Sequence, residues 1–284
     1  MTTSFPVDTL TMEELQQLCS DSSLVDRVQY EAGLNLPMAT DYMAKGFIVL
    51  VYDDQADKLV AAASAIDLMG LNTYEWSLLV HPMYRQIGLG TALFTALQQE
   101  LENRSAVGQL ALMMEQAGYG KDFIVKQGYR YSFSEATLEA KVQNEMEHSN
   151  VEIVPFEHQH TAQLVQVFCE AFGDDEQEAL ELIEYNATNE FLQLWVAIVD
   201  GQVAGSVTTR RDHDAYWITA LAVHTSMQRK GVGTALIYAV HRLALAQGAA
   251  YIKLDVELEN EQALMIYTKT GFLKVAQIDY FSKE

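Results

Sequence analysis

Cysteine is scarce in this 284-residue chain, which has only Cys19 and Cys169. Two cysteines supply neither a disulfide framework nor the four ligands of a structural zinc site, so the sequence predicts a reduced, cytoplasmic protein without a metal. Apolar residues make up 49% of the chain, which excludes a disordered protein, yet no apolar run approaches the roughly 18 residues that a membrane span needs. The opening residues lack the basic start of a secretory signal.

Positive charge is also scarce. The chain has 18 Lys and Arg against 39 Asp and Glu, a net charge of -21 and a pI of about 4.6. A chain this acidic repels the phosphates of nucleic acids and anionic membranes, so neither is expected as a partner. The acidity is spread over both halves, which is typical of a soluble surface. Small amine-bearing or cationic molecules remain candidate partners, and a homodimer is left open.

An internal repeat organises the chain. One offset of 143 residues relates three pairs of segments: Val80-His81 and Val223-His224, residues 88–93 and 231–236, and Gly128-Tyr129 and Gly271-Phe272. Three anchors in one register indicate a duplicated domain. The expected domains are residues 1–147 and 150–284, with the boundary in the polar stretch 143–150.

Alternating strand and helix patterns fill both repeats. In the second repeat the expected strands are 151–154, 192–199, 203–209, 216–223, 251–256 and 272–280, and the expected helices are 158–172, 174–186, 231–246 and 260–270. In the first repeat they are strands 47–52, 59–66, 74–80 and 110–114, helix 89–101, a short helix before Gly128, and two opening helices over 11–20 and 23–33. This order predicts an α/β (α+β) fold, with helices flanking a mixed sheet.

The clearest chemical signal lies where the strand ending at Val223 leads into a loop and then a helix. Gly231 and Gly233 open that helix, and glycine lets a ligand approach the main chain closely. Amides at a helix N-terminus favour anions, so the main chain of residues 229–234 forms a candidate cradle for pyrophosphate.

Two common phosphate-binding motifs do not fit this segment. A P-loop requires a lysine after the glycines, whereas Lys230 precedes them. A Rossmann fingerprint requires a third glycine where Leu236 stands. The pattern that remains is Gln228-x-x-Gly231-x-Gly233.

This pattern resembles the acyl-CoA-binding motif of the GNAT N-acetyltransferase superfamily. A second pattern similar to that family follows the next strand: Asn260-x-x-Ala263-x-x-x-Tyr267-x-x-x-Gly271-Phe272. The resemblance covers residues 151–284 in full and roughly 47–135. It implies two tandem GNAT-fold domains, each a mixed, mostly antiparallel splayed sheet flanked by helices.

The resemblance also implies the cofactor site. Acetyl-CoA would place its pyrophosphate on the cradle and its pantetheine between the two parted strands, where main chain and Asn260 would hold it. The implied acetyl-CoA-binding residues are Leu221, Ala222, Val223, Gln228, Arg229, Lys230, Gly231, Val232, Gly233, Thr234, Asn260 and Ala263.

Acetyl transfer from a thioester to an amine requires a base for the amine and an acid for the leaving thiolate. Tyr267 matches the family's general-acid position, and its other reading is a core-facing tyrosine. For the base we name Glu257, with Asp255, Asp212 and Asp214 as alternatives, because residues 216–223 contain no carboxylate.

Three other histidine and cysteine features have structural readings. His224 and His81 share one repeat position, which predicts that they orient a turn. His158-x-His160 has no evident third metal ligand, and Cys169 fits an amphipathic helix.

The first repeat keeps the cradle as Arg85-x-x-Gly88-x-Gly90 but loses the second pattern. At the offset of 143, Asn260 maps to Ala117, Ala263 to Gly120 and Tyr267 to Ile124. The sequence therefore predicts an N-acetyltransferase that moves an acetyl group from acetyl-CoA to a primary amine by direct attack in a ternary complex. Its C-terminal domain would be catalytic and its N-terminal domain degenerate. The alternative is a non-catalytic acyl-CoA-binding sensor.

Overall fold

The repeat is visible element by element in the computed structural model, which describes residues 1–68, 70–144 and 150–283. Helices α2 and α6 begin and end at positions 143 residues apart, as do strands β5 and β11. The predicted α/β class with a splayed, mostly antiparallel sheet is confirmed. By contact, the chain divides into unit 1 (residues 1–135 and 276–284) and unit 2 (residues 136–275).

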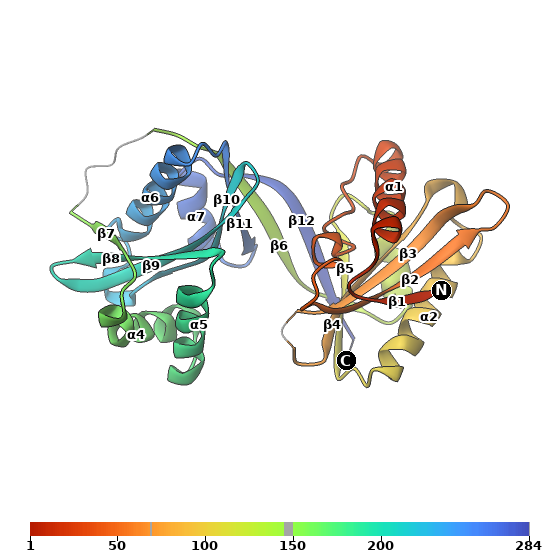
Figure 1. The fold of residues 1–284 in the computed structure, drawn as a ribbon, viewed down its shortest axis with the longest axis horizontal. Helices are drawn as coiled ribbons and strands as arrows, with labels where there is room; N and C mark the ends of the chain where they lie inside the picture. The colour runs from red at the N-terminus through yellow and green to blue at the C-terminus, as the bar shows by residue number, and fades with distance from the viewer. Residues whose placement is uncertain (69, 145–149, 284) are drawn as a thin grey trace. The chain divides into compact units, whose positions relative to one another are not determined.

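Unit 1 is built on a sheet in the order β1-β2-β3-β4-β5-β12 (Figure 1). Only the β4–β5 pair is parallel, and the other four pairs are antiparallel. Its strands are β1 (Thr2–Ser4), β2 (Lys45–Asp53), β3 (Lys58–Asp67), β4 (Thr73–Val80), β5 (Gly108–Met114) and most of β12 (Leu273–Ser282), and its helices are α1 (Thr9–Asp26), α2 (Leu89–Asn103) and α3 (Tyr119–Lys126), with 3-10 turns at Leu36–Met38 and Pro82–Tyr84.

Unit 2 has the equivalent order β6-β11-β10-β9-β8-β7. In Figure 1, α6 covers one face of this sheet, and α4 and α5 cover the other. Its strands are the second half of β6 (Arg130–Lys141), β7 (Glu152–Pro155), β8 (Leu192–Val199), β9 (Gln202–Asp212), β10 (Ala215–Val223) and β11 (Tyr251–Glu257), and its helices are α4 (Thr161–Phe172), α5 (Glu176–Thr188), α6 (Val232–Ala246) and α7 (Glu261–Lys269), with 3-10 turns at His158–His160 and Thr225–Met227.

The last strand of each repeat is exchanged. In unit 1, β12 runs antiparallel to β5, with Ile278 opposite Met114 and Ser282 opposite Leu110. In unit 2, β6 from the first repeat lies beside β11. The expected domains, 1–147 and 150–284, therefore do not coincide with the two units, because each unit takes one strand from the other repeat. The expected boundary falls largely on residues 145–149, which lie outside the described residues.

Side chains that alternate along each strand let the sheet of unit 1 bury apolar residues on both of its faces. In β2, Phe47 and Val49 join the cluster under α2, while Ile48 and Leu50 join the cluster under α1. Trp76 of β4 is 1% exposed and packs edge-on against another buried ring, Tyr129, with ring centroids 5.4 Å apart. Two apolar clusters thus hold the helices of unit 1 on opposite faces of its sheet.

Two predicted elements differ from the structure. The helix predicted over 23–33 is wrong: α1 is continuous through Asp26 and ends where Arg27 adopts a left-handed φ of 59°. The strand predicted over 203–209 extends to Asp212, because β9 stays paired with both neighbours as far as Arg210. Among the described residues, no helix combines the length and apolar character needed to cross a membrane.

The exchanged strand gives a testable stability effect. Phe281 of β12 is 1% exposed and belongs to the α2 cluster of unit 1. Phe281→Ala should lower the free energy of unfolding of unit 1 by about 3–5 kcal/mol, because it removes buried apolar contacts and leaves a cavity. With Trp195 and Trp217 of unit 2 replaced by Phe, Trp76 fluorescence in a urea titration reports on unit 1 alone.

Phe191→Ala is the matched control, because it is the same truncation at a side chain that is 70% exposed in unit 2. It should shift the transition by less than about 0.5 kcal/mol. A Trp76 transition that does not move in Phe281→Ala would contradict the assignment of β12 to the core of unit 1.

Candidate functional site

The sheet of unit 2 opens in its middle. Parallel strands β10 and β11 are paired from Ala215–Tyr251 to Ile218–Leu254, and there the pairing ends. Beyond that point β10 pairs only with β9, from Ala220 to Val223. The strands of unit 1 behave alike, since β4 and β5 pair only as far as Trp76–Ala111. The expected gap between the two strands is therefore present in both units.

A β-bulge marks the opening in unit 2. The register between β10 and β9 shifts between Ile218 and Ala220, so that Thr219 is the extra residue. A bulge bends its strand and increases the local twist. This bend occurs at the same residue where β10 leaves β11. It also leaves one edge of the stretch 220–223 without a strand partner among the described residues.

The loop after β10 has the conformation that its glycine predicts. Arg229 and Gly231 both adopt left-handed backbone, with φ of 60° and 86°. Their counterparts in the first repeat, Gln86 and Gly88, have φ of 62° and 95°. A side chain added at Gly231 or Gly88 would meet nothing within 4 Å. Both cradles thus share one backbone shape and are open above the glycine.

Helix α6 begins at this loop without a side-chain cap on Gly231. The first intrahelical bond is donated by Ala235 to the Gly231 carbonyl, at 2.9 Å. The amides of the preceding turn therefore point out of the helix end, where they and the helix dipole favour an anion. Lys230 and Gly231 are exposed, whereas residues 232–234 are buried.

Side chains tie the cradle to its neighbours. Gln228 donates from Nε2 to the Val223 carbonyl at 3.5 Å and accepts from Gln262 of α7 at 3.4 Å. A side chain at Gly233 would lie 2.8 Å from Ile266 Cδ1, so glycine is what lets α6 and α7 approach this closely.

Asn260 has a structural role in α7. Its Oδ1 accepts a hydrogen bond from the Ala263 amide at 3.0 Å and caps the helix. Only its Nδ2 group, which has no bond to another described residue, remains to contact a ligand. Both residues lie at the start of α7, which follows the end of β11 beyond its last pairing with β10.

Tyr267 lies on the buried face of α7. Its side chain is 7% exposed, and its ring is 5.6 Å from that of Phe272. It joins the cluster in which the ends of β10 and β11 meet the start of α6, through Val223, Val256 and Val232. Burial raises the pKa of Tyr267 to about 12. The phenol is therefore protonated throughout the neutral range.

The candidate bases lie at two different places. Asp212 and Asp214 flank the start of β10, at the opposite end of that strand from the cradle. Asp255 and Glu257 lie on β11 beyond its last pairing with β10. The Asp255 carboxylate accepts a hydrogen bond from Thr137 Oγ1 at 2.6 Å. Desolvation by the surrounding protein atoms raises the pKa of Asp255, although the residue is partly open to solvent.

The two turn histidines are equivalent. His224 Nδ1 accepts from the Ser226 amide at 3.2 Å, and His81 Nδ1 accepts from the Met83 amide at 3.3 Å. His160 accepts from the Glu157 amide in a capping box, which ties up one of its nitrogens. Within the described ranges, no three His, Cys, Asp or Glu side chains group as metal ligands would.

The first repeat differs in side chains rather than in backbone. The Ile124 side chain is 5% exposed. The Ile124 carbonyl accepts a hydrogen bond from the Tyr129 amide, just as the Tyr267 carbonyl accepts one from the Phe272 amide. Ile124 therefore occupies the Tyr267 position and cannot donate a proton from its side chain. Arg85 of this cradle is bound to the Asp26 carboxylate at 2.5 and 2.8 Å.

Sequence reasoning missed one carboxylate in unit 1. Glu75 lies on β4 at the position of Ile218 in unit 2. Burial, with a smaller contribution from the negative charge of Glu135, raises the pKa of Glu75 to about 7. The offset of 143 residues is the signal that identifies Glu75, because it maps the strand before the first cradle onto β10.

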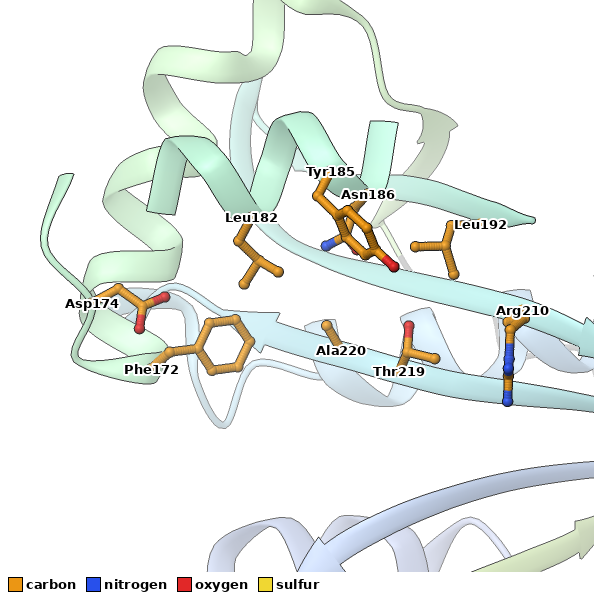
Figure 2. A pocket seen from close by; sticks show the side chains of 9 residues that line it. All are labelled: Phe172, Asp174, Leu182, Tyr185, Asn186, Leu192, Arg210, Thr219 and Ala220. Atoms are coloured by element: carbon orange, nitrogen blue, oxygen red, sulfur yellow. The ribbon is translucent and has the colours of Figure 1, made fainter. Parts of the chain in front are cut away.

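A cavity of about 450 Å³ lies between α5 and strands β8 to β10 in unit 2 (Figure 2). Thr219 and Ala220 form part of its floor, so the cavity lies beside the bulge where the sheet opens. The remaining lining residues come from the end of α4, the loop before α5, α5 itself, the start of β8 and the end of β9: Phe172, Asp174, Leu182, Tyr185, Asn186, Leu192 and Arg210.

Known proteins are similar over the whole chain. A crystal structure of a GCN5-related N-acetyltransferase from Sphaerobacter thermophilus is 16% identical, with a TM-score of 0.77, over 100% of this chain and 95% of its own. A tandem GNAT protein from the clavulanic acid biosynthesis pathway, solved without AcCoA, is 14% identical, with a TM-score of 0.74, over 100% and 98%. A GNAT-family acetyltransferase from Colwellia psychrerythraea is 15% identical, with a TM-score of 0.64, over 100% of both chains.

These structures establish the fold. No curated protein sequence matched the chain. The sequence model of the acetyltransferase (GNAT) family matches it twice, over residues 11–119 and 161–272, once in each repeat. The chain therefore belongs to the acetyltransferase (GNAT) family and carries two copies of its fold in tandem.

Proposed function

We propose that this protein is an N-acetyltransferase that moves the acetyl group of acetyl-CoA to a primary amine, and that the second repeat carries the reaction. The observation that supports this most directly is the opening between β10 and β11, which has the cradle at one end and a cavity beside it. Acyl transfer needs two substrates side by side, and this arrangement offers a place for each.

The cradle would hold the pyrophosphate through main-chain amides between Arg229 and Thr234. Local positive charge from the helix end, with Arg229 and Lys230, offsets the acidic surface of the chain. The unpaired edge of β10 at Leu221, Ala222 and Val223 would bond the pantetheine arm, with the Asn260 Nδ2 group as a further donor.

In the reaction, the amine nitrogen attacks the thioester carbonyl carbon, the C–S bond breaks, and the thiolate takes a proton. We assign that proton to Tyr267, the phenol in the cluster at the ends of β10 and β11. The amine loses a proton to a carboxylate at the end of β11, either Glu257 or Asp255. The raised pKa of Asp255 strengthens it as a base.

A non-catalytic acyl-CoA-binding role is the second candidate, and it fits the first repeat, where the cradle backbone remains and Ile124 replaces the phenol. The test that separates the two is thiol release from acetyl-CoA with a panel of primary amines. CoA binding without thiol release for every amine would favour the sensor.

CoA binding should depend on the cradle of unit 2. Gly231→Asp should weaken CoA binding by at least ~2 kcal/mol, because its carboxylate would face the pyrophosphate. Gly231→Asn is the matched control, because it has the same size and tolerance of left-handed backbone but no charge, and it should lose less affinity. Titration calorimetry with CoA measures both.

The same pair of substitutions at Gly88 tests the first repeat. Loss of affinity in Gly88→Asp, with none in a folded Gly231→Asp, would move the CoA site to unit 1. No loss in either variant would refute the cradle assignment.

Tyr267→Phe should lower kcat by about 10²–10⁴-fold, the usual range for a general acid. The ring and its packing remain, so the variant should fold and bind CoA normally. Since the pKa of Tyr267 is raised to about 12, wild-type kcat should show no decline from this group below about pH 10.

Glu75→Gln is the companion variant, because Glu75 is the carboxylate on the strand before the other cradle. We expect it to retain activity. If Glu75→Gln abolishes thiol release while Tyr267→Phe leaves the chemical step unchanged, the reacting repeat is the first one.

A further inference from the structure

We propose that the cavity under α5 recognises an amine acceptor that also carries an anionic oxygen group, a carboxylate above all, which Arg210 and Asn186 bind. This inference rests on the proposed acetyl transfer and names its acceptor class. The acidic composition of the chain alone favours a cationic acceptor. The side chains that line the cavity, however, include the cationic Arg210 and the amide of Asn186.

Asn186 is the first indication of a ligand. Its side chain lines the cavity and is 4% exposed, yet its Nδ2 group has no hydrogen-bond partner among the described residues. A buried amide that lacks a partner is costly, and NH₂ can only donate. The Asn186 amide therefore has a donor to offer to an acceptor bound in the cavity that its side chain lines.

A second buried polar group lies on the same side of the sheet. Thr208 of β9 is fully buried, and its Oγ1 also lacks a partner among the described residues. Thr208 is opposite Leu194, which packs in the cluster under α4 and α5, so both side chains face those helices. Arg210 is two residues further along β9 and shares this face.

Arg210 supplies the charge. It lines the cavity opposite Leu192 on β8 and Trp217 on β10, with its side chain exposed. Its guanidinium forms no ion pair or hydrogen bond with any described residue, although acidic side chains outnumber basic ones 39 to 18 in this chain. A guanidinium only donates, and its fork matches the two oxygens of a carboxylate.

The cavity has two chemically different ends. In Figure 2, Asp174 and Phe172 lie at one end and Arg210 at the other. Asp175, rather than Asp174, caps α5, so the Asp174 carboxylate is not used by the cap. The Asp174 end adjoins Ala220, beside the opening of the sheet, and is the place for the amine.

The spacing defines the acceptor further. Arg210 is opposite Trp217, and Ala220 is three residues further along β10, a span of roughly 10 Å. Leu182, Leu192 and the Tyr185 ring lie between the two ends. The cavity therefore suits a molecule with an amine and an anionic group separated by an apolar segment.

The test compares ω-amino carboxylates of increasing chain length with n-alkylamines and α,ω-diamines of matched length, using the full chain, acetyl-CoA and thiol release. We expect kcat/KM for the best ω-amino carboxylate to exceed that of the matched alkylamine and diamine by at least about tenfold. A preference for the diamine would overturn the proposal. ω-Amino phosphates form a further arm: if they surpass the carboxylates, the anionic group is a phosphate and the proposed recognition stands.

Arg210→Met should bring the carboxylate-to-alkylamine ratio of kcat/KM close to one, mainly through KM. Arg211→Met is the matched control, because Arg211 is also exposed but points to the other face of β9, and it should leave the ratio unchanged. Asn186→Leu should lower the carboxylate preference while the melting temperature is kept or raised, since it removes an unpartnered amide. A ratio that Arg210→Met leaves unchanged would overturn the anion site.

A binding measurement separates failure of this inference from failure of acetyl transfer. The same ω-amino carboxylates are titrated by calorimetry into wild type and Arg210→Met without acetyl-CoA. Binding that Arg210→Met weakens, with no amine acetylated, would refute acetyl transfer and retain the anion site. Acetylation without any binding that depends on Arg210 would retain acetyl transfer and refute the anion site.

Discussion

The parting of β10 and β11 after four paired residues is the constraint on which the rest of the site depends. Parallel strands in a continuous sheet bond each other along their whole length, and no ligand can enter between them. The bulge at Thr219 bends β10 away at the residue after its last pairing with β11. The same bend puts the cradle at one end of the opening and Thr219 and Ala220 on the floor of the cavity.

The two repeats show how one backbone can carry two sets of side chains. Both open their sheets, and both turn into the following helix through paired left-handed residues. They differ where chemistry would take place: Tyr267 and Ile124 share a position, as do Ile218 and Glu75. A duplicated fold can keep its main-chain geometry because that geometry depends on pairing and on glycine, while side chains at the opening are free to diverge.

Much of this fold could be predicted from the sequence, because the offset of 143 residues and the two cradle glycines fix α2, α6, β5 and β11 together. The helix over 23–33 could not be predicted correctly, because polar residues such as Ser22 are typical of a helix end, whereas Ser22 is a buried residue inside α1. The strand exchange could not be foreseen either. β6 and β12 are the equivalent last strands of the two repeats, and the alternation of their side chains is the same whichever sheet a strand completes.

The cavity escaped sequence analysis for a similar reason. Asn186 and Arg210 are far apart in the chain and belong to no motif. They line one cavity because α5 packs on β8, the strand beside β9. Position 186 is the last residue of a predicted helix, and position 210 directly follows the predicted strand 203–209. The one local sequence feature that points to the cavity is the pair Asp174-Asp175 before α5, because a single aspartate, Asp175, is enough to cap the helix.

The exchanged strand also sets the order in which the chain can mature on the ribosome. Unit 1 includes β12, whose residues pair with β5 across more than half of the sequence. Its sheet therefore remains incomplete, with the edge of β5 at Leu110 to Met114 unpaired by β12, until β12 has been synthesised. Residues 136–275, by contrast, emerge as one continuous segment. The N-terminal unit, although it begins first, is thus the later of the two to complete its sheet, and a nascent chain has an open edge on β5 from the emergence of β5 until that of β12.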